Sequence, residues 1–211
     1  MRWDAVIFDC DGTLVDSERL GNEVLVEYVD RFGIRLTVDD ALARFRGTHM
    51  AACVEQLEAL RGESLPASFV ADLRERMAAA FEVRLQPIAG ALDLVRSLTL
   101  PFCVASSGPR AKIELSLSLT GLLPYFVDRI FSSYELQAWK PSPDLFMHAA
   151  RALNAEPARC AVIEDSLPGI HAGLAAGMQV FALQRHGVDP RIPDEVRVIK
   201  DLRELHVVFG T

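Results

Sequence analysis

The sequence predicts an α/β fold in which a doubly wound parallel sheet carries helices on both faces and a helical block is inserted after the first strand. Three observations support this prediction. Residues 5–8 form a short apolar run that leads directly into two aspartates, as a buried strand would. No convincing strand follows until residue 85. Beyond residue 90, short apolar runs alternate with helical patterns, which is typical of parallel βαβ units.

Composition and charge narrow the possible functions. The 211 residues are half hydrophobic, enough for a full core and a sizeable insert. A formal net charge of -7 without any basic run argues against nucleic-acid binding. The four cysteines lie far apart, so we expect neither a zinc site nor disulfides. No apolar run reaches the roughly 20 residues of a membrane helix, and no signal peptide is recognisable, so we expect a cytoplasmic protein.

The inserted block shows apolar residues at helical spacing. Its first helix begins near Ser17 and ends at Gly33, because glycine commonly stops a helix. Three further helices are predicted at residues 37–45, 48–61 and 66–83. We expect a helical cap domain at 16–85 and an α/β core domain formed by 1–15 and 86–211, with hinges near 13–17 and 86–90.

The core pattern resumes after the insert. Each strand there is short and apolar, and each is followed by a helical pattern. The predicted elements are helix 90–98, strand 102–106, helix 109–119, strand 129–132, helix 143–153, strand 160–164, helix 168–176, strand 178–182, a weaker strand near 196–199 and a final helix near 201–207.

The first strand ends in the sequence DCDGT, which places Asp9 and Asp11 on one side of the chain while Cys10 turns into the core. Two carboxylates so close together repel each other unless a cation binds or one is protonated, and their hard oxygens suit Mg²⁺. An Asp-Gly hairpin turn is the alternative. It is less favoured, because the next segment has a helical pattern.

Polar groups also follow three later strands. Ser106, Ser107 and Gly108 precede a helix, where hydroxyls and free N–H groups can cradle a phosphate, although a serine there is often only a helix cap. Lys140 lies just before a proline and is therefore kept out of a helix; an ordinary surface lysine is the alternative.

The fourth candidate is the pair Glu164 and Asp165, at the end of an apolar strand. A helix cap would explain Asp165 but not its glutamate neighbour. In chain order, the four strand ends thus carry a carboxylate pair, hydroxyls, a cation and a second carboxylate pair. Phosphoryl transfer to a carboxylate requires such a set, because a metal and cations must neutralise the phosphate while carboxylates attack and move protons.

With these motifs in order, the chain resembles the haloacid dehalogenase (HAD) superfamily, with its Rossmannoid core. The stretches DCDGTLVDS, VASSG, WKPSPD and IEDS resemble the four motifs of that superfamily and together cover the chain. The helical insert resembles the cap of the beta-phosphoglucomutase-like subfamily. Within it, the chain looks closest to bacterial sugar-phosphate phosphatases of the 6-phosphogluconate phosphatase type.

The resemblance implies roles for the motif residues. Asp9 would be the nucleophile that becomes an aspartyl phosphate, and Asp11 the acid and base. The second aspartate also separates the phosphatases from the dehalogenases. The phosphoryl oxygens would be bound by Ser106, Ser107, Gly108 and Lys140. The ligands of Mg²⁺ would be Asp9, the main-chain carbonyl of Asp11 and Asp165, with Glu164 close by.

Two departures from the mutases of this subfamily favour hydrolysis. Those enzymes carry a histidine after the first motif and an arginine in the cap loop, and the corresponding positions here are Gly21 and Met50. A mutase must hold a bisphosphate and keep water from its aspartyl phosphate, so the loss of a cap cation disfavours it.

Substrate choice is expected in the cap loop formed by Arg46, Gly47, Thr48 and His49, between two predicted helices. Arg46 is a candidate for gripping a carboxylate or a second anionic group, with a solvated arginine and a helix-capping Thr48 as the alternative. The four other histidines are assigned no role; these are His148, His171, His186 and His206.

The sequence therefore predicts a Mg²⁺-dependent phosphatase that hydrolyses a small phosphorylated metabolite, either a sugar phosphate or a phosphosugar acid, through an aspartyl phosphate. The substrate itself is the only partner expected, with neither nucleic acid nor membrane. A sugar phosphomutase and a non-catalytic metabolite-binding protein of the same fold are the alternatives.

Overall fold

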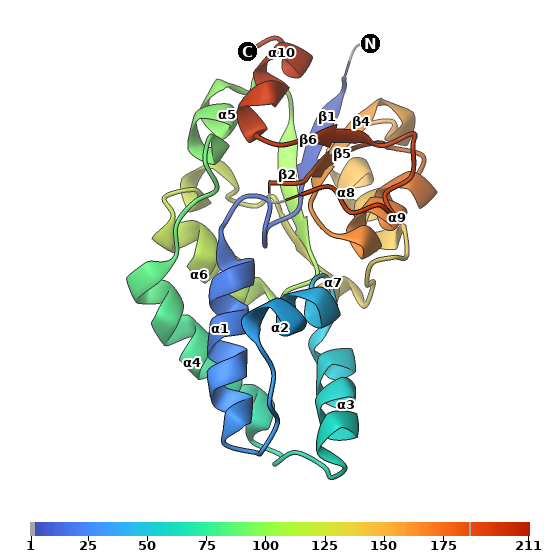
Figure 1. The fold of residues 1–211 in the computed structure, drawn as a ribbon. Helices are drawn as coiled ribbons and strands as arrows, with labels where there is room; N and C mark the ends of the chain where they lie inside the picture. The colour runs from blue at the N-terminus through green and yellow to red at the C-terminus, as the bar shows by residue number, and fades with distance from the viewer. Residues whose placement is uncertain (1–2, 186) are drawn as a thin grey trace.

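A six-stranded parallel sheet forms the centre of the computed structural model, which describes residues 3–185 and 187–211 (Figure 1). Its strand order is β3-β2-β1-β4-β5-β6, so the chain winds outward in both directions from β1. This confirms the predicted doubly wound α/β fold. The strands are β1 (Ala5–Phe8), β2 (Phe102–Ser106), β3 (Ile130–Ser132), β4 (Cys160–Glu164), β5 (Gln179–Leu183) and β6 (Arg197–Ile199).

The alternation of side chains along β1 divides the core into two layers. Val6 and Phe8 belong to one apolar cluster and Ala5 and Ile7 to another, because successive strand residues point to opposite faces. The first cluster is covered by α5 (Ala91–Ser97), α6 (Arg110–Leu119) and α10 (Leu205–Phe209), and the second by α8 (Asp144–Ala152) and α9 (Leu167–Ala175).

Two details of the core differ from the sequence prediction. Helix α7 (Ser133–Leu136) was not predicted, because four residues are too few to produce a periodic pattern. The final predicted helix is interrupted: a 3-10 turn at Leu202–Glu204 comes first, and α10 follows it. Helix ends of this kind often contain 3-10 turns.

The inserted helices are α1 (Ser17–Asp30), α2 (Val38–Phe45), α3 (Met50–Arg61) and α4 (Phe69–Arg84), which we call the cap. They lie together below the carboxyl ends of the strands in Figure 1. Their apolar faces form a separate cluster that includes Leu25, Leu57, Phe69 and Leu73, all nearly inaccessible to solvent. Each such side chain contributes roughly 1.5–3 kcal/mol through burial. The cap therefore has a hydrophobic core of its own.

The two segments that join cap and core are hydrogen-bonded to each other. The N–H of Ile88 donates to the carbonyl of Leu14, and the N–H of Asp16 donates to the carbonyl of Gln86, both at 2.9 Å. These are the segments predicted as hinges. Their pairing brings the two connections between cap and core side by side.

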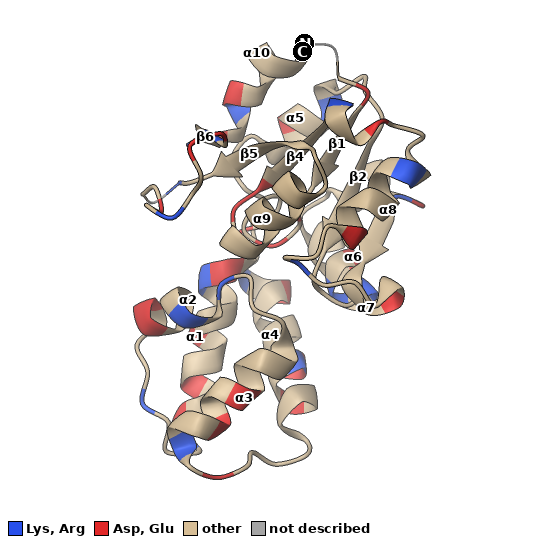
Figure 2. Ribbon diagram, turned by 90° about the vertical axis from the view of Figure 1, so that its right-hand side faces the viewer, with Lys and Arg blue, Asp and Glu red and all other residues tan. Residues whose placement is uncertain are grey.

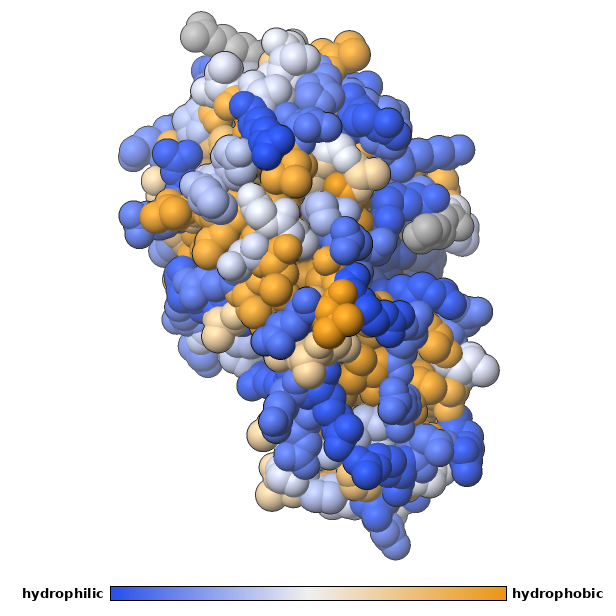
Figure 3. All heavy atoms as spheres, turned by 90° about the vertical axis from the view of Figure 1, so that its left-hand side faces the viewer, coloured by the Kyte–Doolittle hydropathy of each residue, from blue (hydrophilic) through white to orange (hydrophobic). Residues whose placement is uncertain are grey.

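The cap also contacts the core away from the hinges, where α4 packs against α6. Figure 3 views the face that carries α4, α5 and α6, and apolar side chains run down its middle from core to cap. Basic and acidic residues are interspersed over the face seen in Figure 2.

All four cysteines are free and buried. Nowhere in the described residues does a helix have the length and apolar character needed to cross a membrane.

Candidate active site

The carboxyl ends of β1, β2 and β4 meet at one edge of the sheet, because these strands are parallel neighbours. Between this edge and the cap lies a cavity of about 420 Å³, a size suited to a small metabolite. All eight core residues predicted for the site line it; they are Asp9, Asp11, Ser106, Ser107, Gly108, Lys140, Glu164 and Asp165. The structure therefore brings together the four groups of residues that the sequence singled out. Three of them lie at strand ends as predicted, whereas Lys140 is separated from β3 by helix α7.

Lys140 is the buried cation that joins the first and fourth strand ends. Its Nζ lies 2.5 Å from Oδ1 of Asp9 and 2.7 Å from Oε1 of Glu164. Burial alone would lower the pKa of Lys140, but these two carboxylates raise it above its ordinary value. Burial raises the pKa of Asp9, and the ammonium group of Lys140 opposes that effect. The lysine is charged and fixed in position next to Asp9.

The second oxygen of Glu164 is bound by the backbone that follows it. Oε2 accepts the N–H groups of Asp165 and Ser166, each at 2.7 Å, and the hydroxyl of Ser166 at 2.9 Å. Both oxygens of Glu164 thus already have partners. Its carboxylate orients Lys140 and the start of α9.

Asp11 is held by two residues that the sequence did not single out. Nζ of Lys112 lies 2.8 Å from Oδ2, and the hydroxyl of Ser17 donates to Oδ1 at 2.5 Å. Burial would raise the pKa of Asp11, but Lys112 and Ser17 lower it below its ordinary value. Asp11 is therefore an ionised and oriented carboxylate.

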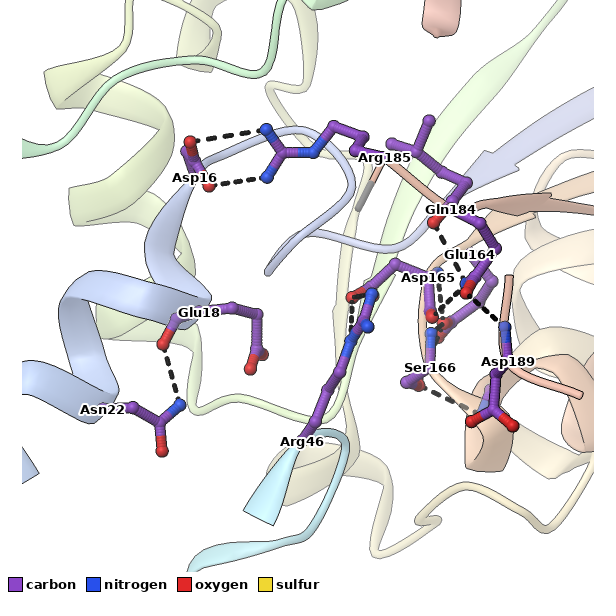
Figure 4. Close-up of polar contacts among 12 residues, drawn as sticks. Asp16, Glu18, Asn22, Arg46, Glu164, Asp165, Ser166, Gln184, Arg185 and Asp189 are labelled. Carbon is purple, nitrogen blue, oxygen red and sulfur yellow. Dashed lines mark hydrogen bonds and ion pairs between the residues drawn. The ribbon is translucent and has the colours of Figure 1, made fainter. Parts of the chain in front are cut away.

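Asp165 contacts the cap directly. Oδ2 accepts a hydrogen bond from Nε of Arg46 at 2.9 Å and forms an ion pair with Nη2 at 2.7 Å. Figure 4 shows the Arg46 side chain extending from the cap toward Asp165, with Glu18 on its other side. Burial raises the pKa of Asp165 to about 8, against the lowering effect of Arg46. Arg46 is not among the residues that line the cavity, and instead lines a neighbouring cleft between cap and core.

The end of β2 presents its polar groups toward the same cavity. The buried hydroxyl of Ser106 accepts the N–H of Gly108 at 3.1 Å, and α6 begins at Arg110. Free N–H groups near the start of a helix attract anions. This strand end is suited to hold phosphate oxygens.

The catalytic end of the cavity carries a surplus of negative charge. Four carboxylates form ion pairs with three cations. Lys140 pairs with both Asp9 and Glu164, whereas Asp11 pairs with Lys112 and Asp165 pairs with Arg46. A phosphate dianion would be repelled unless a metal cation were added.

The donor set fits Mg²⁺. The chain approaches Asp165 so closely at Gly12 that a Cβ there would lie 2.4 Å from Oδ2, which leaves room only for glycine between the first and fourth strand ends. Within the described residues, no three Asp, Glu, His or Cys side chains are grouped to hold a metal. The expected set needs only two carboxylates, from Asp9 and Asp165, and one main-chain carbonyl, and Mg²⁺ commonly keeps several waters.

The cap wall of the cavity includes Gly47, Thr48, His49 and Met50. Nδ1 of His49 accepts the N–H of Ala52, which caps α3 and leaves the proton on Nε2. Gly21 lies outside the cavity, on α1. A Cβ on Gly21 would be in ordinary contact with Met77 and Phe81.

Among the described residues, the other histidines take no part in the cavity lining. His148 packs edge-on against Phe131, His206 contacts the hydroxyl of Thr211, and His171 is exposed. His186 lies outside the described residues.

Three charged residues of the cavity lining were not predicted, namely Lys112, Glu18 and Arg74. Lys112 lies in the first turn of α6, three positions after Pro109, so the helix predicted at 109–119 already placed it near the second strand end. Glu18 and Arg74 lie on cap helices and carry no local signal. Only the closure of the cap over the core brings them to this site.

A doubly wound sheet whose strand ends present two carboxylate pairs, hydroxyls and a buried lysine defines an enzyme of phosphoryl transfer. Residues 3–177 match the family model described as haloacid dehalogenase-like hydrolase. The chain belongs to the haloacid dehalogenase-like hydrolase family.

Relatives agree with this assignment. The 6-phosphogluconate phosphatase of Escherichia coli is 38% identical over 181 residues, covering 85% of this chain and 82% of that protein. A haloacid dehalogenase-like protein of Agrobacterium tumefaciens has a similar crystal structure, with a TM-score of 0.83, 31% identity and coverage of 99% of this chain and 98% of the other.

A third relative carries ligands. The HAD family hydrolase of Deinococcus radiodurans, solved with bound phosphate and sodium, has a TM-score of 0.77 at 30% identity and covers 99% of this chain and 95% of its own. The family and the phosphatases among its relatives make this chain a phosphoric monoester hydrolase.

Proposed function

We propose that this protein is a Mg²⁺-dependent phosphatase that hydrolyses a small phosphorylated metabolite, a sugar phosphate or a phosphosugar acid. The observation that carries the proposal is the buried Lys140, which bridges Asp9 and Glu164 at the carboxyl ends of the strands. A lysine fixed there is positioned to neutralise a phosphoryl group as it approaches Asp9. The similarity to 6-phosphogluconate phosphatase supports the substrate class.

In the first step, an oxygen of Asp9 attacks the phosphorus atom and the ester P–O bond breaks, which gives an aspartyl phosphate and an alkoxide. Asp11 is assigned as the acid that turns the alkoxide into an alcohol. Because Lys112 and Ser17 lower the pKa of Asp11 in the free protein, this carboxyl group must take up a proton in the substrate complex before that step. In the second step, Asp11 takes a proton from a water that attacks the same phosphorus, and the bond to Asp9 breaks. Inorganic phosphate leaves, and Asp9 is restored.

Other residues bind and orient the phosphoryl group. The hydroxyl of Ser106, the N–H groups of Ser107 and Gly108, and the ammonium of Lys140 are assigned to its oxygens. Asp9, the carbonyl of Asp11 and Asp165 are assigned to Mg²⁺, which supplies neutralisation of the phosphate charge when it is bound. Glu164 is assigned to the neighbourhood of the metal, where it keeps Lys140 in place.

The cap is assigned to substrate choice and to the exclusion of water. Gly47, Thr48 and His49 line the cavity and are candidates for contact with the leaving group. Arg46 forms an ion pair with Asp165. The binding of a substrate anion by Arg46 stays a prediction, because the ion pair would first have to break. The domain boundaries and the cytoplasmic location also stay predictions.

A phosphate-release screen tests the proposal. Sugar phosphates, phosphosugar acids and nucleotides are incubated with the protein and Mg²⁺, with chelator in a parallel series. We expect release that depends on Mg²⁺ and is abolished in Asp9→Asn, whose fold is checked by circular dichroism. Activity of this variant near that of the wild type would contradict the role of Asp9.

A second assay addresses the sugar phosphomutase alternative. A hexose 1-phosphate is supplied with a bisphosphate activator, and isomerised product is measured against free phosphate. We expect free phosphate, because Met50 stands in the cavity wall where a mutase needs a cation. No release from any compound would favour a metabolite-binding protein.

A further inference from the structure

The cavity is also lined by Arg74, on helix α4 of the cap. Arg74 lies about two turns, roughly 10 Å of helix, from Phe81, whose ring contacts Lys112 at the catalytic end. A guanidinium N–H of Arg74 donates to the hydroxyl of Tyr134 at 3.2 Å, and its Cζ lies 5.6 Å from the centre of that ring. Tyr134 belongs to the core helix α7 and also lines the cavity. The arginine is thus held at the cavity by a neutral partner from the opposite side.

The other strong cations around the cavity are already neutralised. Lys140 pairs with two carboxylates, Lys112 pairs with Asp11, and Arg46 pairs with Asp165. For Arg74, in contrast, no carboxylate lies within ion-pairing distance among the residues that the structure describes. Its remaining N–H donors are therefore available to an anion.

The cavity lining also includes an apolar set of side chains. It is formed by Phe45, Met50, Met77, Phe81 and Leu115, from both cap and core. Such a wall packs against the C–H faces of a carbon chain and offers no hydrogen bonds to its hydroxyls. Selectivity must then come from the ends of the cavity.

Arg74 is exposed, and Tyr134 is its contact across the boundary between cap and core. Tyr134 packs edge-on against Trp139 at 6.0 Å between ring centroids, and Trp139 lies 6.4 Å from His49 of the cap loop. Ordering of a free arginine side chain would reduce the affinity for an anion. The contacts with Tyr134 restrict the Arg74 side chain and so lower this cost.

We propose that Arg74 binds a second anionic group, a carboxylate, at the end of the substrate opposite the phosphoryl group, so that the enzyme selects phosphorylated sugar acids over neutral sugar phosphates. The inference rests on the proposed function and names the substrate class of the same site. Tyr134 is a positioning residue that orients the guanidinium.

The test compares two substrates that differ only at the distal end. 6-Phosphogluconate carries a carboxylate at C1, and sorbitol 6-phosphate carries a hydroxymethyl group there. We expect the wild type to have the higher kcat/KM for the acid. In Arg74→Met, the ratio of the two kcat/KM values should fall by about tenfold or more, because a charge-assisted contact is lost. Arg74→Lys should retain part of the preference.

Two matched variants serve as controls. Arg76 lies on the same helix, stacks over Tyr28 and does not line the cavity, so Arg76→Met should keep the wild-type ratio. Arg46→Met distinguishes the two candidate cations. The inference is overturned if the wild type does not prefer the acid, if Arg74→Met keeps the wild-type ratio, or if Arg46→Met loses the preference while Arg74→Met keeps it.

A binding measurement separates this inference from the proposed function. The Asp9→Asn variant is titrated with each phosphorylated compound by calorimetry, with and without Arg74→Met. Tighter binding of the acid that depends on Arg74, in a protein whose wild type releases no phosphate, would leave the carboxylate site standing and overturn the phosphatase. Equal binding of both compounds, beside normal turnover by the wild type, would overturn the carboxylate site alone.

Discussion

Arg46 of the cap donates a hydrogen bond of 2.9 Å from Nε to Oδ2 of Asp165 at the end of strand β4, and its Nη2 forms an ion pair with the same oxygen at 2.7 Å. The pair crosses from cap to core, and 119 positions separate the two residues in the sequence. Because Asp165 is a proposed ligand of Mg²⁺, the guanidinium and the metal would compete for its carboxylate. The contact therefore links the position of the cap to the affinity for the metal.

Removal of this competitor should strengthen metal binding. In Arg46→Met we expect the Kd for Mg²⁺ to fall several-fold, since a partly exposed ion pair contributes about 1 kcal/mol. Calorimetric titration of the metal-free protein with Mg²⁺ measures this Kd. Arg44→Met is the control, because Arg44 is an exposed residue of the same helix end. A weaker affinity in Arg46→Met would show that the arginine assists the metal.

Gly47 lets the cap loop lie directly on the core. Its φ is +72°, and a Cβ there would lie 2.8 Å from Cβ of Ser166. Gly62 has a similar φ of +79° with nothing within 4 Å. Both Gly→Ala variants should lose about 1 kcal/mol of unfolding free energy. Only Gly47→Ala should also lower kcat/KM, by about tenfold, because it holds the cap away. Equal kinetics in the two variants would contradict this role of Gly47.

Lys140 should be needed for stability as well as activity. Lys140→Met leaves the buried carboxylates of Asp9 and Glu164 without their cation, which should cost about 3 kcal/mol or more of unfolding free energy. Urea denaturation in the absence of Mg²⁺ measures this loss. The control is Lys200→Met, at an exposed position, which should change the free energy of unfolding by less than about 0.5 kcal/mol. A stable Lys140→Met variant would contradict the buried pairing.

Glu18 should make stability depend on pH. Burial, followed by repulsion from Asp11, raises its pKa to about 7. The folded protein then binds a proton at Glu18 more tightly than the unfolded chain does, so stability falls as the pH rises toward and past 7. Between pH 5 and 8, the unfolding free energy of Glu18→Gln should rise relative to the wild type by about 1 to 2 kcal/mol, since the side chain is only partly exposed.

This dependence is measured by urea denaturation in chelator at several pH values. Glu27→Gln is the matched control, because Glu27 is exposed on the same helix. Its difference from the wild type should not change with pH. If the difference in unfolding free energy between Glu18→Gln and the wild type did not change with pH, Glu18 would be ionised like an ordinary surface residue.

Much of the fold was predictable because its signals are local. The apolar run before Asp9, the short apolar strands that alternate with helical patterns and the glycines after the first three cap helices all act within a few residues of one another. They correctly predicted every long helix and all six strands. They missed α7, which is too short for a pattern, and the 3-10 turn before α10.

The same local logic brought the core residues of the site together. Once the strands are known to be parallel, their carboxyl ends must share one edge, so Asp9, Ser106 and Glu164 could be predicted as neighbours. Their chemical roles remain predictions, which the variants above address.

The sequence by itself thus determined the sheet, the inserted helices and the core residues that meet at the sheet edge, because backbone pattern and turn chemistry act over short distances. Only the tertiary structure decided which cation each carboxylate receives. Arg46 pairs with Asp165 and Lys112 with Asp11, whereas Arg74 in the cavity lining has no carboxylate partner within the described part of the chain. These pairings depend on how the cap closes over the core and on the rotamers of long side chains, and no short stretch of sequence encodes either.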